Sequence, residues 1–495
     1  MIAVPIVATT VEEARRQIRQ AQAVADVIEL RIDYLEQPDA LPFRGVAAKP
    51  VIVTCRSTRD GGEFRGTEAE RIRLLQAAVD AGVDYVDVEL EAFGSIKRSG
   101  KTKLIASWHD FEGTVENLDE VHRKLVATGA DVVKLVTFAR DVRDNIRLLE
   151  LTRTSRTPTI AFAMGERGQV SRILTGKFGG FLTFGSLETG KESAPGQITA
   201  RQLRELYRYP TVGPATQLYG VVAKPVAHSM SPAIMNASFA AMGIDACYVP
   251  MLTDDAPATV KAFRTLNFAG YSVTLPHKET VMEALDEIDD LARQIGAVNT
   301  IVRRDDGSLW GTNTDCAAAI SSIEDALSGT PKSGTSPLAG KRVTIIGARG
   351  VARAIGFGLK HAGARITICN RTPAKAEELA AELGCATAAL TEAGSLGANV
   401  ICNATSVGMH PDVEESPVPA SVFKPGMVAF DAVYHPLETR FLREAKSTGC
   451  VIVTGLEMFV GQAAEQFRLW TGRQAPTELM RNVALEHLAA REEMA

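Results

Sequence analysis

The chain has 495 residues, too many for one ordinary core, so its length predicts two or three domains. A net charge of -5 with 45% hydrophobic residues is typical of a globular protein and gives no reason to expect nucleic acid or a membrane as a partner. Seven cysteines stand singly without a C-x-x-C pair, so neither a disulfide framework nor a metal site is expected. No apolar run could span a bilayer and no targeting leader is recognisable, so the expected location is cytoplasmic.

The first two hundred residues alternate short β-branched runs with amphipathic stretches. This α/β alternation predicts parallel strands with helical crossovers, and eight repeats favour a (β/α)8 barrel over a doubly wound open sheet. The predicted strands span residues 2–8, 27–33, 50–56, 85–90, 103–110, 131–139, 159–165 and 181–186. The predicted barrel domain covers residues 1–210, and a flexible linker rich in Pro and Gly is expected at 209–217.

Catalytic side chains of such barrels lie at the carboxyl ends of the strands. Here Lys134 lies in an apolar strand, and His109 ends the preceding strand. A structural lysine would be salt-bridged, for example to Glu29, and a lone histidine is as often structural as catalytic. A catalytic lysine would instead have its pKa lowered by burial and by nearby Arg31 or Arg56. Its uncharged amine would then attack a small anionic ketone. His109 would then carry the proton.

Six motifs in this region are IELRID, TCRSTRDGG, SWHDFEGT, DVVKLV, MGERGQVSR and SAPGQ. In this order, across residues 1–208, they resemble those of type I 3-dehydroquinate dehydratases. The resemblance implies that Lys134 forms a Schiff base with the substrate and that His109 is the general acid/base. It also implies a set of substrate-binding residues: Glu29, Arg31, Arg56, Arg172, Ser193 and Gln197. Asp60 stands where the family usually has glutamate, about 1.5 Å longer, and is expected to orient His109 as part of the catalytic set.

A second α/β region begins near residue 218, and a Ser/Gly-rich stretch at 328–340 precedes a strand, a turn, a helix and a strand. This is the form of a dinucleotide-binding unit, although Arg349 replaces the second glycine of its fingerprint. The turn that would bind the pyrophosphate consists of Gly347, Arg349, Gly350, Val351 and Ala352 together with Ala348. The next strand ends at Asn370, Arg371 and Thr372. A cation here suits a 2′-phosphate, whereas an NAD site would have an acidic residue, so the expected cofactor is NADP(H).

Polar loop residues around this unit are individually ordinary turn and cap residues. As a set, AHSMSP, YSVTLPHKE, GAVNT, GTNTDC, CNATSVGM, DAVYHPLET and GLEMFVGQA resemble the motifs of shikimate dehydrogenases across about residues 218–490. The resemblance implies that Lys278 and Asp315 are the catalytic pair, with Lys278 donating a proton to the substrate carbonyl. The implied substrate contacts are Ser229, Ser231, Thr274, Asn299, Tyr434 and Gln462. The implied cofactor contacts beyond the turn are Asn403, Thr405, Ser406 and Gly455.

Two residues depart from the shikimate dehydrogenase motifs. Ser272 stands where asparagine is usual and is expected to loosen the fit around Thr274. Cys316 follows Asp315 where glycine is usual, and a loop with positive φ would be restricted by its side chain.

The product of the first implied reaction, 3-dehydroshikimate, is the substrate of the second. We therefore expect a bifunctional shikimate-pathway enzyme, both lyase and oxidoreductase, that acts in aromatic amino acid biosynthesis and reduces 3-dehydroshikimate to shikimate. The barrel would be followed by a two-domain α/β dehydrogenase: a substrate domain at 218–325, completed by helices at 457–495, and a Rossmann-like NADP domain at 338–456. One alternative is a catabolic quinate/shikimate dehydrogenase fused to the dehydratase, against which Arg371 argues. Another is a ligand-sensing regulator without catalysis, against which the retained catalytic groups argue.

Overall fold

The computed structural model describes residues 1–43, 45–190, 192–328 and 336–492. Contacts divide the chain into two compact units. The first contains Met1–Pro232 and Gly243–Phe268, and the second contains Ala233–Met242 and the chain from Ala269 onward. Most of the Ser/Gly-rich stretch at 328–340 and the last three residues of the predicted C-terminal helices lie outside the described residues.

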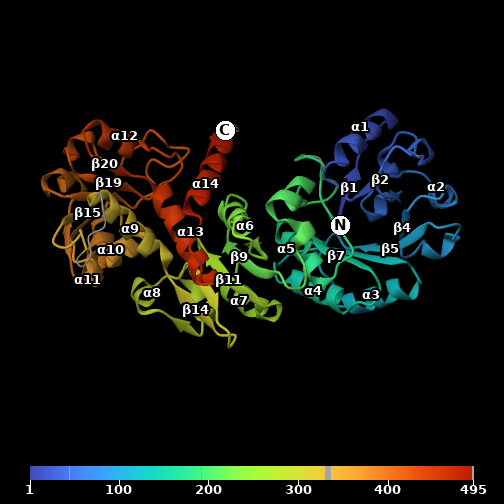
Figure 1. The fold of residues 1–495 in the computed structure, drawn as a ribbon, viewed down its shortest axis with the longest axis horizontal. Helices are drawn as coiled ribbons and strands as arrows, with labels where there is room; N and C mark the ends of the chain where they lie inside the picture. Colours follow the sequence, from blue (N-terminus) through green and yellow to red (C-terminus); the bar gives the residue numbers. More distant parts are fainter. Residues whose placement is uncertain (44, 191, 329–335, 493–495) are drawn as a thin grey trace. The chain divides into compact units, whose positions relative to one another are not determined.

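Eight parallel strands form the predicted barrel in the first unit (Figure 1), and they pair in the order β7-β6-β5-β4-β3-β2-β1-β8. The backbone N–H of Phe181, just before β8, donates to the carbonyl of Thr159 at the start of β7 over 2.8 Å, so the sheet is nearly closed. The strands are β1 (Ile2–Ile6), β2 (Val27–Arg31), β3 (Val51–Thr54), β4 (Tyr85–Glu89), β5 (Lys103–His109), β6 (Val132–Phe138), β7 (Thr159–Met164) and β8 (Thr183–Phe184).

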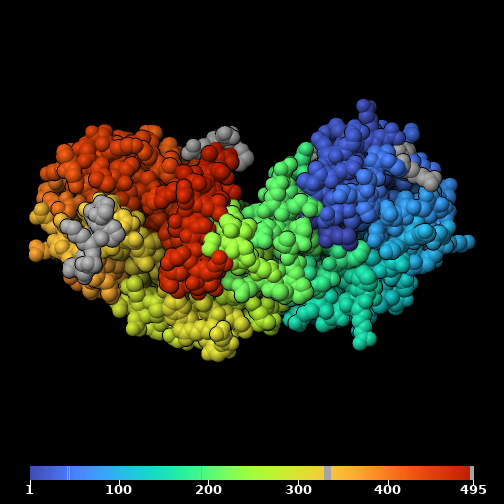
Figure 2. Space-filling model, in the orientation of Figure 1, coloured from blue at the N-terminus to red at the C-terminus, as the bar shows by residue number. Residues whose placement is uncertain are grey.

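Helices lie outside the strands (Figure 1), and Figure 2 shows the atoms of this part of the chain in blue to green. They are α1 (Val11–Ala21), α2 (Glu68–Asp80), α3 (Leu118–Ala127), α4 (Asp144–Thr154) and α5 (Gln169–Leu174). Two crossovers differ from the prediction, because only short 3-10 turns follow β2 and β4. In the first of these, Pro38, Pro42 and Pro50 remove backbone donors that a helix would need.

The segment at 209–217 is packed against the barrel, so the expectation of a flexible linker is wrong. Tyr209 is 2% exposed and Thr216 is 1% exposed. The ammonium group of Lys177 donates to the carbonyl oxygens of Pro214 and Thr216 over 2.8 and 2.7 Å. Pro and Gly set the turns as expected, but burial of the aromatic side chain fixes the segment in place.

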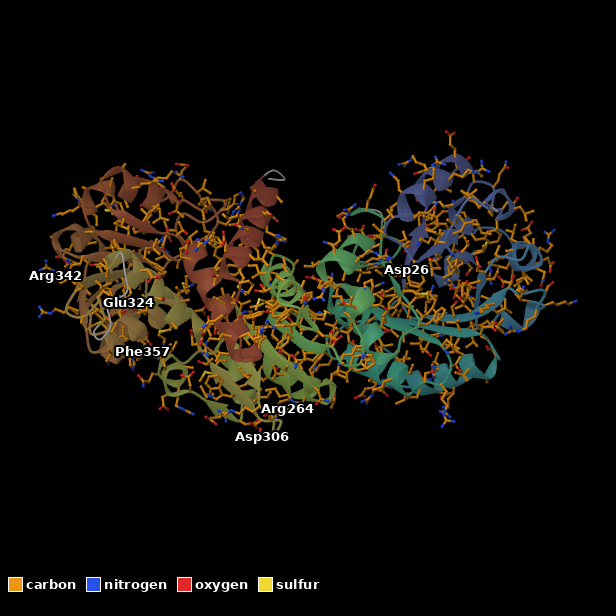
Figure 3. All side chains as sticks on the ribbon, in the orientation of Figure 1. Asp26, Arg264, Asp306, Glu324, Arg342 and Phe357 are labelled. Atoms are coloured by element: carbon orange, nitrogen blue, oxygen red, sulfur yellow. The ribbon has the colours of Figure 1, made fainter. Side chains whose placement is uncertain are left out.

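The end of the barrel opposite the predicted site is held by Asp26 (labelled in Figure 3). Its carboxylate accepts from the backbone N–H of Ile2 over 2.8 Å and from Arg204 over 2.7 Å. The same unit also contains the parallel pair β9 (Gln217–Ala223) and β10 (Ala246–Leu252), the helix α7 (Ala256–Phe263) and the start of α6 (Ser231–Ala241).

The second unit contains mixed strands followed by a parallel sheet. The first group comprises β11 (Phe268–Val273), β12 (Glu287–Ile288), β13 (Thr300–Arg303) and β14 (Leu309–Thr312), with α8 (Asp290–Ile295) and α9 (Thr314–Ser328). The parallel sheet has the order β17-β16-β15-β18-β19-β20, which is that of a dinucleotide-binding fold. Its strands are β15 (Arg342–Ile346), β16 (Arg365–Cys369), β17 (Ala386–Ala388), β18 (Val400–Asn403), β19 (Val428–Asp431) and β20 (Val451–Val453). Its helices are α10 (Gly350–His361), α11 (Pro373–Leu383) and α12 (Arg440–Ser447).

The chain ends in α13 (Gly455–Thr471) and α14 (Thr477–Glu492). Helices α9 and α13 approach closely at Gly461, where an added Cβ would lie 3.1 Å from the Cβ of Ala318. No described helix has the length and apolar character needed to cross a membrane.

The burial of Tyr209 predicts how this segment contributes to stability. Replacing Tyr209 with Ala removes a large buried ring and should lower the free energy of unfolding by about 3–5 kcal/mol. The Tyr209 hydroxyl has no hydrogen-bond partner among the described residues, so Tyr209→Phe should be neutral or stabilising. Urea unfolding of both variants checks this, with exposed Thr211→Ala as the control. A Tyr209→Ala protein as stable as Thr211→Ala would contradict the buried arrangement.

Candidate active sites

A cavity of about 60 Å³ lies at the carboxyl ends of the barrel strands. All nine side chains that the sequence predicted for the barrel site line it: Glu29, Arg31, Arg56, Asp60, His109, Lys134, Arg172, Ser193 and Gln197. Glu29 and Arg31 both face inward, as the strand periodicity predicted.

Lys134 is 5% exposed, and its amine faces carboxylates. The Nζ atom lies 3.0 Å from Oδ2 of Asp87 and 3.5 Å from Oε1 of Glu29. It also lies 4.4 Å from the ring centre of Phe184. Asp87, a residue that the sequence analysis did not single out, is therefore nearer to the amine than the predicted partner Glu29.

Asp87 belongs to a buried network of charges that extends away from the cavity. Its carboxylate accepts from Arg56 over 2.9 Å, and Arg56 also donates to Glu89 over 2.9 Å. Glu89 in turn pairs with buried Arg71. Burial would raise the pKa of Asp87, but the charges of Arg56 and Lys134 outweigh it and hold that pKa far below its usual range.

The arginines expected to act on Lys134 are each paired with carboxylates. Arg56 is paired as above, and Arg31 forms a bidentate pair with Asp33 over 2.9 and 2.7 Å. Asp87 and Glu89 alternate on β4 in the sequence YVDVEL, the same spacing that identified Glu29 and Arg31 on β2. That spacing was the signal that could have found them.

His109 ends β5 directly beside β6, with Ser107 in register with Lys134. Burial lowers the pKa of His109 well below its usual value, and the charges of Arg56 and Lys134 lower it further, so the ring is neutral at neutral pH. The ring stacks on Phe111 with centroids 6.0 Å apart, and its buried Nδ1 has no partner among the described residues. A neutral imidazole beside an amine can accept a proton.

Asp60 lies in the cavity wall but does not orient His109 in this structure. Its Oδ2 accepts from the hydroxyl of Ser57 over 2.6 Å, and the exposed guanidinium of Arg59 lies 3.5 Å away. The shorter aspartate is thus held by its own turn.

Arg172 lies on α5 and is 1% exposed. Its Nε and one Nη have no hydrogen-bond partner among the described residues, and the guanidinium lies 4.3 Å from the ring centre of Phe162. Burial without an opposing anion lowers the pKa of Arg172. Nearby, Gln197 accepts from the backbone N–H of Ser193 over 2.9 Å, which holds the loop after β8. A buried guanidinium with open donors is suited to binding a carboxylate.

In the second unit, Lys278 and Asp315 form the predicted pair, with Nζ and Oδ2 2.6 Å apart. Asp315 lies in the first turn of α9, where the helix N-terminus favours a carboxylate. Asn299 accepts from the backbone N–H of Thr314 over 2.8 Å and donates to its hydroxyl over 3.0 Å. The backbone N–H of Val298 donates to the carbonyl of Lys278 over 2.8 Å, so the two loops are fixed together.

The remaining predicted substrate contacts are distributed over both units. Ser229 and Ser231 belong to the first unit, where the backbone N–H of Ser231 donates to the Ser229 hydroxyl over 3.3 Å. Thr274, Tyr434 and Gln462 belong to the second unit. In that unit the ring of Tyr434 stacks on Phe459 with centroids 5.2 Å apart.

The two departures from the dehydrogenase motifs are accommodated without strain. Ser272 donates to Gln466 over 2.7 Å, and Gln466 donates to the carbonyl of Asn299 over 3.2 Å, a connection that the sequence analysis missed. Cys316 lies within α9 and has no positive φ, so the expected restriction of a loop is wrong.

The predicted cofactor turn lies between β15 and α10. Gly347 has φ +115°, and an added Cβ would lie 2.9 Å from the carbonyl oxygen of Ala404, so this position requires glycine. Arg349 is extended, with φ -112°, and precedes α10, whose first residue Gly350 has open space around it. Val351 and Ala352 continue the helix, whose N-terminal N–H groups can bind phosphate.

Strand pairing brings the predicted 2′-phosphate residues next to this turn, because Ile346 is in register with Cys369. Asn370 donates to the carbonyl of Thr372 over 2.9 Å and shapes the turn that carries Arg371. Thr405 donates to Asn403 over 2.7 Å, and exposed Ser406 follows. Gly455 begins α13, where an added Cβ would lie 2.5 Å from the carbonyl oxygen of Val433. These small residues and open donors fit a dinucleotide.

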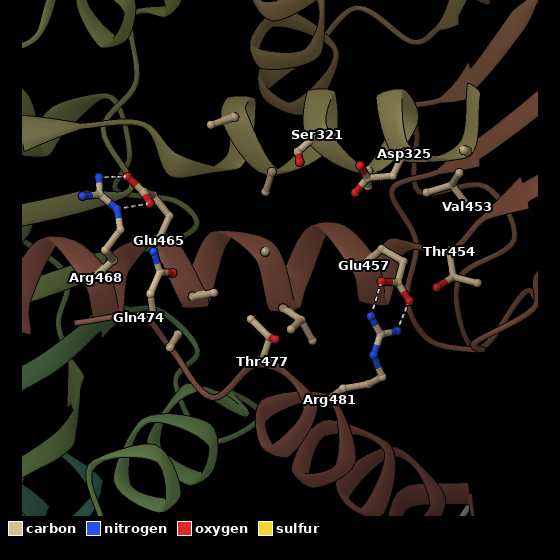
Figure 4. A pocket seen from close by; sticks show the side chains of 18 of the residues that line it. Ser321, Asp325, Val453, Thr454, Glu457, Glu465, Arg468, Gln474, Thr477 and Arg481 are labelled. Carbon is tan, nitrogen blue, oxygen red and sulfur yellow. Dashed lines mark hydrogen bonds and ion pairs between the residues drawn. The ribbon is translucent and has the colours of Figure 1, made fainter. Parts of the chain in front are cut away.

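A larger cavity of about 680 Å³ lies elsewhere in the second unit, between α9, α13, β20 and the start of α14 (Figure 4). Ion pairs occupy both of its ends: Glu457 pairs with Arg481, and Glu465 with Arg468. None of the predicted site residues lines it. Among the described residues, no group of three His, Cys, Asp or Glu side chains is placed to hold a metal ion.

Comparison with protein families gives one match to the barrel and three to the rest of the chain. Residues 2–214 match type I 3-dehydroquinase. Residues 221–301 match the shikimate dehydrogenase substrate binding domain, residues 331–417 match shikimate / quinate 5-dehydrogenase, and residues 455–485 match the shikimate 5'-dehydrogenase C-terminal domain.

Individual proteins give the same result. The chain is 42% identical to a chloroplastic bifunctional 3-dehydroquinate dehydratase/shikimate dehydrogenase of Arabidopsis thaliana, over 97% of this chain and 83% of that protein. It is 42% identical to a shikimate dehydrogenase (NADP(+)) of Moorella thermoacetica over 56% of this chain and 95% of that protein. Shikimate 5-dehydrogenase of Thermus thermophilus, solved with NADP(H) and shikimate, is 37% identical with a TM-score of 0.50, covering 55% of this chain and all 100% of that one.

The charge network predicts a large cost for removing Asp87. Asp87→Asn leaves Arg56 and Lys134 buried with less compensation and should lower the free energy of unfolding by about 3–5 kcal/mol at pH 7. Asp84→Asn keeps an oxygen that can accept from the exposed Val51 N–H and loses only the charge of that acceptor, so it should cost no more than about 1 kcal/mol.

The contribution of Asp87 to the free energy of unfolding should depend on pH. Because the native pKa of Asp87 lies far below the unfolded value, its contribution to stability is complete above about pH 5, begins to fall below about pH 4 and is fully lost only when the pH reaches the native pKa. Urea unfolding from pH 3 to 7 should therefore show a constant difference in stability between the wild type and Asp87→Asn above about pH 5 that begins to narrow toward pH 3. A difference that is already small at pH 7 would contradict the network.

Proposed function

Because the chain belongs to the family of bifunctional 3-dehydroquinate dehydratase/shikimate dehydrogenases, we propose residue-level roles for its two activities. It is a shikimate-pathway dehydratase and an NADP-dependent shikimate dehydrogenase. We assign the dehydratase to residues 1–210, the substrate domain to 218–325 with the C-terminal helices, and the cofactor domain to 338–456. The seven unpaired cysteines favour a reducing compartment such as the cytoplasm.

In the barrel, 3-dehydroquinate binds with its carboxylate on the open donors of Arg172, closed over by Ser193 and Gln197. Its ring hydroxyls meet Glu29, Arg31 and Arg56. Lys134 on β6 and neutral His109 on the neighbouring strand β5 line the same cavity, and this arrangement is the observation that carries the proposal.

The proposed dehydration is a series of proton transfers between the substrate, Lys134 and His109. The Lys134 amine loses a proton and attacks the ketone, forming an imine with loss of water. His109 takes a proton from the carbon next to the imine carbon and returns it to the departing hydroxyl, which leaves as water. Hydrolysis of the imine releases 3-dehydroshikimate and restores the amine. Asp87 holds Lys134 in place, and Asp60 lines the entrance.

In the dehydrogenase, 3-dehydroshikimate is reduced at its carbonyl. Bound NADPH supplies the hydride. Lys278 donates a proton to the carbonyl oxygen, and Asp315, 2.6 Å from the Lys278 amine, holds the lysine in place and contacts a substrate hydroxyl. The remaining hydroxyl and carboxylate contacts come from Ser229, Ser231, Thr274, Asn299, Tyr434 and Gln462.

The cofactor is bound by the turn from Gly347 to Ala352 and by the residues after β16. We assign the 2′-phosphate to Arg371, assisted by Asn370 and Thr372, and the walls of the cleft to Asn403, Thr405, Ser406 and Gly455. Arg349 replaces a glycine but keeps an unstrained extended backbone, so the approach to the pyrophosphate is retained.

Covalent trapping tests the dehydratase mechanism. Borohydride added with 3-dehydroquinate should reduce the imine and leave the substrate attached to Lys134, detected by peptide mass spectrometry. Lys134→Ala should show no adduct and lose dehydratase activity, while NADPH-dependent reduction of 3-dehydroshikimate by the same protein continues. An adduct elsewhere, or undiminished dehydration by Lys134→Ala, would refute the imine.

Cofactor preference tests the role of Arg371. An arginine–phosphate contact contributes about 1.5–3 kcal/mol, so Arg371→Ala should reduce kcat/KM for NADPH about 10- to 100-fold and leave that for NADH nearly unchanged. Arg365→Ala, an exposed arginine at the other end of β16, is the matched control. Equal losses of kcat/KM with both cofactors would contradict the assignment of the 2′-phosphate to Arg371.

A further inference from the structure

A buried carboxylate of the cofactor domain, used by neither proposed mechanism, connects two loops that carry proposed ligand contacts. Asp431 ends β19 and is fully buried. Its Oδ1 accepts from Nδ2 of Asn403 over 3.0 Å and from the backbone N–H of Val433 over 2.9 Å. Its Oδ2 accepts from the hydroxyl of Thr439 over 2.6 Å. These donors are all neutral.

On one side, Asp431 orients the amide of Asn403. A carboxylate only accepts, so the amide must turn its NH2 group toward Asp431, and that group also donates to the carbonyl of Val407 over 3.2 Å. The amide oxygen consequently faces Thr405 and accepts from its N–H over 3.1 Å and from its hydroxyl over 2.7 Å. The Thr405 hydroxyl accepts from the N–H of Val407 over 3.1 Å, so the loop at 403–407 is held by this chain of bonds.

On the other side, Asp431 holds both ends of the loop that carries Tyr434. Val433 lies just before that tyrosine, and Thr439 caps α12, where its hydroxyl accepts from the N–H of Leu442 over 3.3 Å. The contact between Gly455 and the carbonyl of Val433 brings the start of α13 to the same point. One side chain thus fixes two walls of the proposed cofactor cleft.

We infer that Asp431 is a positioning residue of the dehydrogenase, whose ionised carboxylate holds the 403–407 loop and the Tyr434 loop in the conformation that binds NADPH. The inference rests on the cofactor contacts proposed above for Asn403 and Thr405.

Burial raises the pKa of Asp431 to about 6, and the bonds from Thr439, Val433 and Asn403 only partly oppose this. Protonation of Asp431 turns one of its acceptor oxygens into a donor, and this weakens the hydrogen bonds that Asn403 and Thr439 donate to the carboxylate. NADPH affinity should therefore be complete above this pKa and fall as pH drops through it.

Other titratable groups near Asp431 are few among the described residues. The thiol of Cys402 on β18 stays protonated, because burial raises its pKa and the charge of Asp431 raises it further. The Tyr434 loop also carries His435, whose ring stacks on His410 with centroids 5.5 Å apart. The histidine pair is therefore a second group at this loop that the test must distinguish from Asp431.

The test compares the full chain with Asp431→Asn by fluorescence titration of NADPH from pH 5 to 8. Loss of a hydrogen bond to a charged group predicts that the wild-type Kd rises about tenfold between pH 8 and pH 5. Asp431→Asn should bind about tenfold more weakly at pH 8 and show only the shallow change due to the 2′-phosphate of NADPH itself, which is common to both proteins. Dehydratase activity on the same chain reports the concentration of folded protein and should be unchanged.

Two variants of Thr439 separate positioning from general destabilisation. Thr439→Ser keeps the hydroxyl and should retain the wild-type profile. Thr439→Val removes a donor to the charged form and should move the midpoint to higher pH. Equal NADPH affinities for wild type and Asp431→Asn at every pH would overturn the inference. A tenfold change in Kd that survives in Asp431→Asn, beyond the shallow change due to the 2′-phosphate, would also overturn it and assign the pH dependence to the histidine pair. If Arg371→Ala still alters cofactor preference in that case, the proposed cofactor site stands and only the role of Asp431 fails.

Discussion

The barrel depends on one buried carboxylate that serves two cations. Asp87 contacts Arg56 on one side and Lys134 on the other, both within 3.0 Å. Taking such cations out of water costs several kcal/mol each unless an anion accompanies them. Glu89 extends the network and compensates the charges of Arg56 and Arg71. Among the described residues, no carboxylate pairs with the buried guanidinium of Arg172, so an incoming anion would bind most strongly there. The distribution of charge thus separates cations that build the barrel from one that receives substrate.

The dehydrogenase uses the same pair of residue types in a different environment. The side chains of Lys278 and Asp315 are 25% and 13% exposed, whereas those of Lys134 and Asp87 are 7% and 1% exposed. Water screens the more exposed pair, so its contribution to stability is smaller. Its proton can exchange with solvent after each turnover, as a proton donor requires. In the barrel the amine must instead become uncharged to react as a nucleophile.

Sequence periodicity predicted the eight barrel strands and the parallel cofactor sheet because burial imposes regular patterns on them. It did not predict which charges pair, since Asp87 lies 47 residues from Lys134 and meets it only through strand order. It also misjudged local backbone: Cys316 is helical, and the segment at 209–217 is packed. At 209–217 tertiary contacts, rather than the Gly and Pro content, decide the conformation. At Cys316 the helix α9 decides it, where the backbone N–H of Cys316 donates to Asn313 over 3.2 Å. The roles of individual site residues remain predictions.

The packed segment also determines where the two activities could be separated into independent polypeptides. A barrel ending at residue 208 would lose Tyr209 and expose the apolar surface that its ring covers. It would also leave the Lys177 amine without its two carbonyl acceptors. A break after Thr216 keeps these contacts but severs the bond from its hydroxyl to Asp245 (2.7 Å), which belongs to the dehydrogenase half of the sequence. The residues between the two enzymes therefore act as a shared structural element, and a gene fusion or fission at this point would have to rebuild a core.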